Sequence, residues 1–440
     1  MPHNKPKNCL IISSRPPNHS AGLGQDMMDA LKAQGINVDF LTRFKDKEAP
    51  EEVIGVRKSP FQFRHPSIYK SFIARAIRKI YRIIKPIRPL YIINNGIEIK
   101  YKNEENPTFP IRAVLSKITK KYDLIITLFW QDMINSSTLK AIYDVQKCPI
   151  LIYSPDMSPM TGGCFYFGKC VNYMTGCGRC PGLNSSNLND QTRINLHLKS
   201  INYQDCNIAF LGNTWMLKCF NTSALSNTCL KYNVGIVLNE TDFIPYNHHK
   251  RTSIREDFGI KSTDFLIMLR STRDIRKGNN DIYRSITDLS NEYKGNRRIV
   301  VLTVGEDYFE NISQNNIKVI NQGTVTKKEL IDLYNASDIF VSASHDDAGP
   351  SMINQSLLCG TPVVSYKTGV ALDVIIDGNS GFTVEPGNIS QLTQALHDII
   401  SMSSLSYDEL RSKTREIGVK FNSRSGFAQR IIEIYNEMRV

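Results

Sequence analysis

The chain has 440 residues, which is too long for a single hydrophobic core, so we expect two or three domains. Hydrophobic residues make up 41% of it and charged residues 22%, proportions typical of a globular protein, and the net charge of +12 favours an anionic partner. No run of about twenty apolar residues and no signal-peptide pattern is found, which argues against a membrane-spanning helix and a secreted protein. With ten cysteines, these features predict a cytoplasmic protein with reduced or metal-bound thiols.

The chain opens with a strand, helix and strand. Cys9–Ser13 and Ile36–Thr42 are short apolar stretches, and Gln25–Gln34 between them has helical character and ends before a glycine. The intervening loop contains Gly22 and Gly24, where the backbone can approach a ligand without a Cβ in the way. Two glycines alone fit a plain loop equally well.

The positive charge is concentrated early in the chain. Residues 53–97 contain ten Lys or Arg and no Asp or Glu. Within them, Ser67–Lys85 predicts an amphipathic helix with one basic side, so 67–88 fits docking on an anionic membrane surface, here the inner face of the cell membrane. A core-facing helix with a solvated basic side explains the pattern equally well. Nucleic-acid binding is a third interpretation, weakened by the few aromatic residues in the stretch.

A polar loop follows the buried strand Ile150–Ser154. It begins at Pro155 and Asp156, and ligands of α/β sheets bind at such loops, although a carboxylate there can also simply cap a turn. Four cysteines then follow in the pattern C-x5-C-x6-C-x2-C among several glycines, and they are Cys164, Cys170, Cys177 and Cys180. Four thiolates can close tetrahedrally on a structural zinc ion, so we expect zinc; an iron–sulfur cluster or free thiols are the alternatives.

The second half of the chain predicts another α/β domain, entered through the polar residues after Pro245. The strand Phe265–Arg270 leads into a basic loop with Arg273, Arg276 and Lys277, and a helix starts at Asn279. Positive charge before a helix N-terminus suits a phosphate.

The most informative stretch runs from Asp346 to Val364. A buried strand precedes it, a Gly-Pro turn leads into a helix, and a second apolar strand follows. The unpaired amides and positive dipole at such a helix start favour an anion. Asp347 and Gln355 lie eight positions apart, one on the loop and one in the helix.

This stretch resembles the acidic motif of retaining family 4 glycosyltransferases of the GT-B fold, in which two glutamates hold the nucleotide-sugar. Asp347 and Gln355 stand in their places, and both can still accept hydrogen bonds. The Thr-Gly-Gly-Cys sequence at 161–164, with the cysteines after it, is similar to a subgroup of bacterial surface-polysaccharide enzymes; Pro155 replaces a histidine that many of them carry, while Asp156 remains.

The resemblance implies an α/β fold class with two Rossmann-like domains facing across a cleft. It implies an acceptor-side domain at 1–246 with a cysteine-rich insert at 162–182, a nucleotide-sugar domain at 247–424, and a helix at 425–440 that crosses back. Lys277 and Arg273 would neutralise the donor diphosphate, helped by Gly22 and Gly24, and no catalytic cofactor is expected. The remaining donor contacts are assigned to Asp347, Gly349, Ser351, Met352, Ile353 and Gln355. The catalytic candidates are Asp156, Lys277 and Asp347.

The function implied is transfer of a hexose from a nucleotide-sugar, with retention, to a hydroxyl of a glycan or polyprenyl-linked oligosaccharide. Two other classes remain open. One is a nucleotide-sugar epimerase, which can share this architecture, and the other is a non-catalytic sugar-nucleotide or glycan-binding protein, which the replaced glutamates would suit. Nucleic acid is not an expected partner.

Overall fold

The computed structural model describes residues 5–19, 22–45, 49–58, 92–94, 96–99, 103–106, 108–307 and 317–439. The chain divides into two compact units. Unit 1 comprises 1–211, 219–232 and 431–440, and unit 2 comprises 212–218 and 233–430. The sequence placed the boundary after Tyr246, within the segment that leads to the second domain. The basic stretch 67–88 lies outside the described residues.

Unit 1 is built on a seven-stranded sheet in the order β10-β9-β7-β6-β1-β2-β3. The apolar strand sequences are almost fully buried, as expected for a parallel sheet covered on both faces. The strands are β1 (Asn8–Ser13), β2 (Asn37–Lys45), β3 (Val53–Lys58), β6 (Leu124–Thr127), β7 (Ile150–Tyr153), β9 (Ile208–Gly212) and β10 (Leu230–Asn233).

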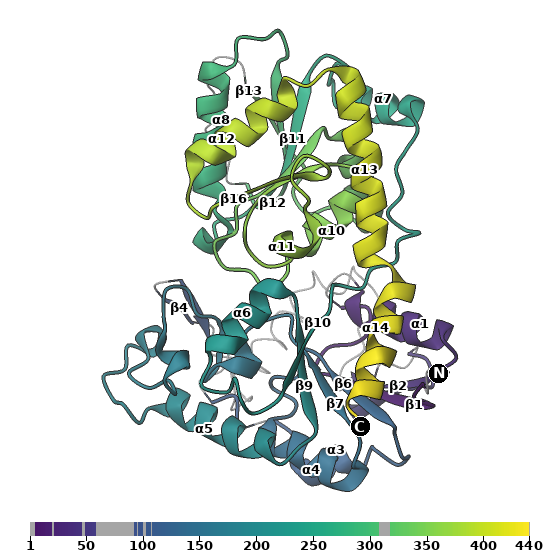
Figure 1. The fold of residues 1–440 in the computed structure, drawn as a ribbon, viewed down its shortest axis with the longest axis vertical. Helices are drawn as coiled ribbons and strands as arrows, with labels where there is room; N and C mark the ends of the chain where they lie inside the picture. The colour runs from purple at the N-terminus through teal and green to yellow at the C-terminus, as the bar shows by residue number, and fades with distance from the viewer. Residues whose placement is uncertain are drawn as a thin grey trace, which may run out of the picture. The chain divides into compact units, whose positions relative to one another are not determined.

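Helices flank this sheet (Figure 1). They are α1 (Leu23–Ala33), α3 (Ile111–Leu115), α4 (Ser136–Gln146) and α5 (Gln191–Gln204). The helix α6 (Thr214–Thr222) begins in unit 2, and its residues from Cys219 belong to unit 1. The start of α4 is capped by Asn135 and that of α5 by Asp190, whose side chains accept backbone N–H groups of the first turn. A small antiparallel sheet joins β4 (Ile92–Asn94), β5 (Ile97–Ile99) and β8 (Cys164–Tyr166).

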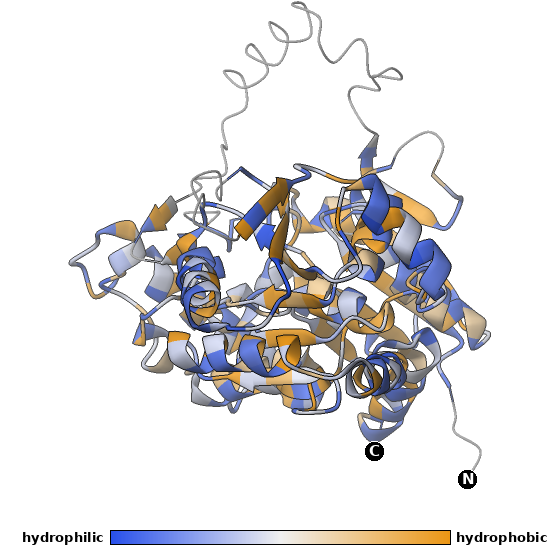
Figure 2. Ribbon diagram, turned by 90° about the horizontal axis from the view of Figure 1, so that it is seen from above, coloured by the Kyte–Doolittle hydropathy of each residue, from blue (hydrophilic) through white to orange (hydrophobic). Residues whose placement is uncertain are grey.

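Unit 2 has a six-stranded parallel sheet in the order β13-β12-β11-β14-β15-β16. Its strands are mainly orange in Figure 2, which matches their buried Val, Ile, Leu and Phe residues. They are β11 (Phe265–Ser271), β12 (Ile299–Gly305), β13 (Ile317–Asn321), β14 (Ile339–Ser342), β15 (Val363–Tyr366) and β16 (Gly381–Val384).

One hydrophobic core lies on each face of this sheet. The first packs α9, α10 and α11 against it and the second packs α8 and α12. The helices of unit 2 are α7 (His248–Asp257), α8 (Asn279–Glu292), α9 (Lys327–Ala336), α10 (Ser351–Leu358), α11 (Ala371–Val374), α12 (Ile389–Ile400) and α13 (Ser404–Asn422). The last helix, α14 (Arg424–Glu437), starts in unit 2, and its residues from Ile431 belong to unit 1.

The predicted fold class is confirmed, because each unit is a Rossmann-like parallel sheet with helices on its faces. The return of the last helix to the first domain is confirmed as well. The structure differs from the expectation at α7, where the polar residues predicted to lead into the second domain form a helix capped by Asn247. No helix among the described residues is both long and apolar enough to cross a membrane.

Candidate functional site in unit 2

Two loops of unit 2 meet where the strand order reverses. The strand β11 is flanked by β12 on one side and by β14 on the other, so the connections after β11 and β14 leave the sheet in opposite directions. In doubly wound sheets a crevice opens at this switch point, outside the carboxyl ends of the strands. The loops concerned are 272–278 and 343–350, and four of the predicted donor-site residues lie on them: Arg273, Lys277, Asp347 and Gly349.

The loop after β11 presents Lys277 through a short 3₁₀ turn, Ile275–Lys277, whose start is capped by Asp274. Gly278 then has φ of 66° and forms the N-cap of α8. A Cβ on Gly278 would lie 1.9 Å from the Ala343 carbonyl oxygen, so only glycine lets the two loops approach this closely. The His345 N–H donates to the Arg276 carbonyl oxygen at 2.8 Å and joins the loops directly.

Asp347 is the central carboxylate of the site. Only 3% of it is exposed, and its Oδ2 accepts a hydrogen bond from the Lys277 ammonium. Its Oδ1 accepts the Gly349 N–H at 3.2 Å, and the Arg276 guanidinium lies 3.8 Å from Oδ2. Burial alone would raise the pKa of Asp347, but Lys277 and Arg276 hold it below its ordinary value. The carboxylate is therefore ionised at neutral pH.

The arginine that joins this cluster is Arg276. Its Nη1 donates to the Asp346 carbonyl oxygen at 2.7 Å, and its Nη2 pairs with Asp274 at 2.9 Å. Arg273, the arginine chosen from the sequence, is exposed, and its backbone N–H donates to Glu306 at 2.8 Å. The structure brings Lys277, Arg276 and Asp347 together and leaves the Arg273 side chain out of the described contacts.

The helix α10 begins after Pro350, and no side chain caps its first turn. The first amides of a helix have no partner within it, so Ser351 and Met352, both half-buried, place N–H donors at the end of the 343–350 loop. Ile353 is fully buried in the core and anchors this turn. The start of α10 thus adds a positive dipole end to the two basic side chains.

Gln355 turns inward from the same helix. It is 3% exposed, and its Oε1 accepts a hydrogen bond from the Tyr334 hydroxyl at 3.1 Å. Gly349 precedes the helix, and a Cβ there would meet Ile236 at 3.1 Å. Gly349 thus lies just before α10, and Gln355 lies in its second turn. Their contacts with the donor stay predictions.

A histidine that the sequence did not single out adjoins the cluster. His345 Nε2 lies 2.8 Å from the Asp281 carboxylate on α8, and the Tyr366 hydroxyl donates to the same carboxylate oxygen at 2.9 Å. The His345 ring also packs against Tyr366. No sequence spacing links these three residues, and they come together only because β14, β15 and α8 adjoin.

In unit 1, Gly22 and Gly24 open α1. Gly22 is its N-cap with φ of 87°, a conformation that favours glycine. A Cβ on Gly24 would lie 3.0 Å from the Pro17 carbonyl oxygen and from the Phe40 ring, so this glycine lets the loop pack on the sheet. These observations explain both glycines by local geometry and leave their predicted contact with a diphosphate as a prediction.

Asp156 lies in a buried turn of unit 1. Its Oδ1 accepts the Ser158 N–H at 2.9 Å, the Ser158 hydroxyl at 2.6 Å and the Gln131 amide at 3.3 Å. These contacts are those of a turn-capping carboxylate. Nearby, the buried Lys199 ammonium pairs with Glu104 and donates to the Ser158 carbonyl oxygen at 2.5 Å. The catalytic role of Asp156 stays a prediction.

The four-cysteine segment packs as an apolar cluster. Cys164 and Cys180 are buried with Ile97 and Ile99, and Cys170 packs against them. In the part of the chain that the structure describes, no group of three or more His, Cys, Asp or Glu side chains is placed to hold a metal ion. The zinc site stays a prediction, which metal analysis of protein purified without chelator tests.

Part of the chain matches a known protein family. Residues 250–421 match the family model described as Glycosyl transferases group 1, and this match lies within unit 2. An uncharacterized glycosyltransferase of Methanocaldococcus jannaschii is 25% identical over 134 residues, which is 29% of this chain and 34% of that protein. The alignment thus spans about a third of the length of this curated relative.

Solved structures are similar over nearly the whole chain. Sucrose-phosphate synthase of Thermosynechococcus elongatus has a TM-score of 0.62 at 14% identity, covering 98% of this chain and 99% of that one. HepE of Anabaena, solved in complex with UDP-glucose, has a TM-score of 0.57 at 13% identity, with 98% and 99% coverage. These likenesses show the fold, and that fold is GT-B, as predicted from the sequence.

Proposed function

We propose that the protein is a retaining glycosyltransferase. It moves a hexose from a nucleotide-sugar to a hydroxyl of a glycan or polyprenyl-linked oligosaccharide during polysaccharide synthesis. The glycosyl transferases group 1 match over unit 2 and the UDP-glucose complex of the similar HepE support a nucleotide-sugar donor. The stretch 67–88, outside the described residues, would attach the enzyme peripherally to an anionic membrane.

The observation that carries the proposal is the convergence of Lys277, Arg276 and the Gly349 N–H on Asp347, just before the start of α10. Two fixed cations and a helix N-terminus in one crevice suit a diphosphate, which carries more negative charge than the single carboxylate now paired there. A bound donor would take over part of the Lys277 and Arg276 hydrogen bonding. Asp347 would then be able to accept hydrogen bonds from hydroxyls of the donor sugar.

The chemistry needs little beyond electrostatics. The bond between the anomeric carbon and the donor phosphate breaks, the acceptor oxygen bonds to that carbon on the same face, and the acceptor proton passes to a donor phosphate oxygen. Negative charge grows on the leaving diphosphate during this step, so preorganised cations and amides lower its barrier. Lys277 and Arg276 supply the cations, while Ser351 and Met352 supply the amides.

Two measurements test the proposal. A panel of nucleotide-sugars is screened for protection against thermal unfolding, because a ligand of the folded state raises its apparent stability. The stabilising donor is then incubated with candidate acceptors, and the anomeric configuration of the product is determined by NMR. We expect one donor to stabilise the wild type and Lys277→Ala to lose both stabilisation and transfer. Transfer at the wild-type rate by Lys277→Ala would refute the assignment.

The same assays separate the other functions. A non-catalytic binding protein would be stabilised by the donor without transferring sugar to any acceptor. An epimerase would convert or hydrolyse the donor without an acceptor. The replacement of both usual glutamates, by Asp347 and Gln355, is the feature that makes the first alternative worth testing.

A further inference from the structure

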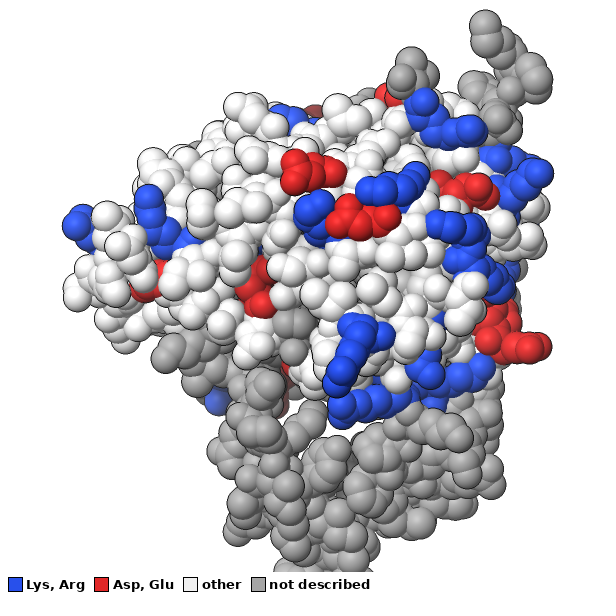
Figure 3. All heavy atoms as spheres, turned by 90° about the horizontal axis from the view of Figure 1, so that it is seen from below, with Lys and Arg blue, Asp and Glu red and all other residues white. Residues whose placement is uncertain are grey.

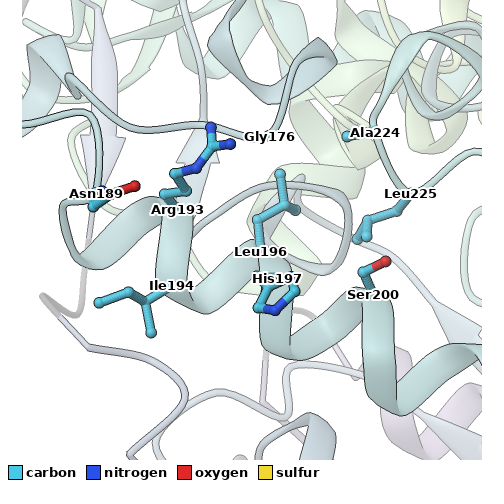
Figure 4. Close-up of a pocket in the computed structure, with 9 residues that line it drawn as sticks. All are labelled: Gly176, Asn189, Arg193, Ile194, Leu196, His197, Ser200, Ala224 and Leu225. Atoms are coloured by element: carbon cyan, nitrogen blue, oxygen red, sulfur yellow. The ribbon is translucent and has the colours of Figure 1, made fainter.

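A cavity in unit 1 is not used by the proposed transfer. Its volume is about 460 Å³, within the range of small-molecule sites, and it lies between α5 and the segment that carries Ala224 and Leu225 (Figure 4). Gly176 of the cysteine-rich segment forms part of its edge. The remaining lining residues are Asn189, Arg193, Ile194, Leu196, His197 and Ser200.

The polar side of this cavity is basic. Arg193 and His197 are four residues apart on α5 and therefore lie on one face of the helix. Figure 4 shows the Arg193 side chain extending toward Gly176, and its Nη1 lies 3.4 Å from the Cys177 carbonyl oxygen. Among the described residues, no carboxylate forms an ion pair with Arg193 or lines the cavity. Most of the guanidinium hydrogen-bonding capacity is thus available to a ligand.

The sequence around the cavity contains few acidic residues. Between Met157 and Gln204 the only acidic residue is Asp190, and its carboxylate is taken up by N–H groups of Cys180 and Thr192. On the face drawn in Figure 3, acidic and basic side chains lie near one another. An anion in the cavity would meet Arg193 and His197, while the carboxylate of Asp190 is already held by backbone N–H groups.

The other wall is apolar. Leu196 and Leu225 are almost completely buried at the floor, with Ala224 beside Leu225. Ile194 lies at the edge with 47% of its surface exposed. A ligand that fills the space therefore needs a carbon part as well as an anionic group.

We propose that this cavity binds a phosphate ester. The phosphate accepts hydrogen bonds from Arg193, with His197 and Ser200 completing its contacts, and the carbon part lies on Leu196, Ala224 and Leu225. A water-soluble phosphate ester and a phospholipid headgroup both have this chemistry. The hydrocarbon chains of a phospholipid would leave the cavity past the exposed Ile194 at its edge.

The first experiment is titration calorimetry of the full chain with sn-glycerol 3-phosphate and, separately, with inorganic phosphate. We expect saturable binding of the ester, weakened at least about tenfold by the double substitution Arg193→Gln with His197→Gln, which removes the guanidinium and imidazole donors. Ser200→Leu fills the cavity without changing its charge and should weaken binding as well. Lys117→Gln, an exposed lysine at the end of α3, is the charge-matched control and should bind normally.

The second experiment is cosedimentation with vesicles of phosphatidylcholine, with or without about 30 mol% phosphatidylglycerol. Binding of the soluble ester identifies a soluble source. Binding only to the anionic vesicles, lost in the double variant and kept in Lys117→Gln, identifies the lipid headgroup. The proposal is overturned if the protein binds neither sn-glycerol 3-phosphate nor the anionic vesicles. It is also overturned if the wild type and the double variant bind them equally well. Equal affinity for inorganic phosphate and for the ester would also overturn it, because the apolar wall would then contribute nothing.

Discussion

The Lys277 ammonium donates a hydrogen bond to the Asp347 carboxylate, although 70 residues separate them in the chain. The pair is almost fully enclosed, with 17% and 4% of the two side chains exposed. An ion pair so placed is costly to desolvate and is seldom kept for stability alone. The pair lies at the switch point of the unit 2 sheet, on the two loops that the strand order brings together. Ligands of doubly wound sheets bind at this point, so we expect the pair to serve ligand binding.

The first prediction distinguishes the two arginines of the 272–278 loop. We expect Arg276→Ala to lower kcat/KM for the donor by about a hundredfold, because Arg276 stands beside Lys277 and Asp347 and would stabilise the leaving diphosphate. Arg273→Ala, the matched control on the same loop, should change it by less than about threefold. Steady-state kinetics with the donor found by thermal stabilisation provide the measurement. A larger loss of kcat/KM in Arg273→Ala than in Arg276→Ala would instead support Arg273, the arginine chosen from the sequence, as the diphosphate ligand.

Most elements of the fold could be predicted because their signal is local. The buried strands of both sheets are short apolar runs, and helices such as α8, α9 and α12 show apolar periodicity with turn residues at their ends. The helix α7 has no such signal. Its position is fixed by Arg251 and Arg255, which donate to the carbonyl oxygens of Asn335 and Ala336 and to the Asp338 carboxylate. These partners are more than 80 residues away and cannot be recognised from the sequence of α7 itself.

The candidate site was predictable to a similar degree. The motif around Asp347 and the lysine before Gly278 identified both loops, because a helix start after a glycine turn is visible in the sequence. The selection of Arg276 over Arg273 depends on which side chain the 3₁₀ turn directs toward Asp347. The contact between His345 and Asp281 depends on the packing of α8 beside the 343–350 loop, and no local pattern encodes it.

The second prediction concerns the buried carboxylate that holds α7. Asp338 is 3% exposed, accepts the Leu266 N–H at 2.7 Å and pairs with Arg251 at 2.6 Å and Arg255 at 3.2 Å. Asp338→Asn leaves two buried guanidinium groups without their counter-charge, so we expect a loss of about 3–5 kcal/mol in the free energy of unfolding of unit 2. Urea denaturation measures it. Asp288→Asn, on the exposed side of α8, should cost less than about 0.5 kcal/mol.

Asp338 should also make the stability of unit 2 depend on pH in the acid range. Burial alone would raise the pKa of Asp338, but Arg251 and Arg255 hold it below its ordinary value. A carboxyl with a lowered folded-state pKa contributes stability above its unfolded pKa and loses it as the pH falls through the folded pKa. We therefore expect the wild type to lose more stability than Asp338→Asn on acidification below about pH 4. Parallel losses in both proteins would contradict this.

The third prediction concerns the stability of unit 1, which should fall as the pH rises. Burial raises the pKa of Glu104 to about 7 despite the Lys199 ammonium, and it raises the pKa of Glu105 beside it. A carboxyl with a raised folded-state pKa favours the folded state at low pH, and this contribution is lost as the pH rises from the unfolded value to about 7. Unit 1 should therefore be less stable at pH 8 than at pH 5.5, by an amount on the order of 2 kcal/mol.

The measurement uses the two tryptophans of the chain. Trp130 is buried in unit 1, whereas Trp215 belongs to unit 2, so the substitution Trp215→Phe leaves a fluorescence reporter of unit 1 unfolding. Glu104→Gln in this background should flatten the pH dependence, since the titrating group is removed. Equal stability at both pH values in the parent would show that the buried carboxyls do not titrate as expected.

The last prediction tests whether the close approach of the two site loops is required. Gly278 and Gly323 have nearly equal φ of 66° and 60°, but a Cβ on Gly278 would lie 1.9 Å from the Ala343 carbonyl oxygen, whereas a Cβ on Gly323 meets nothing within 4 Å. Alanine at either position carries the backbone strain of a positive φ, about 1 kcal/mol. Only Gly278→Ala must also push the loops apart. We expect its unfolding free energy to fall clearly further than that of Gly323→Ala in urea denaturation, with loss of donor stabilisation. Because the conformational strain is the same in both variants, equal losses would mean that the loops can separate freely and that their approach does not hold Lys277 and Asp347 together.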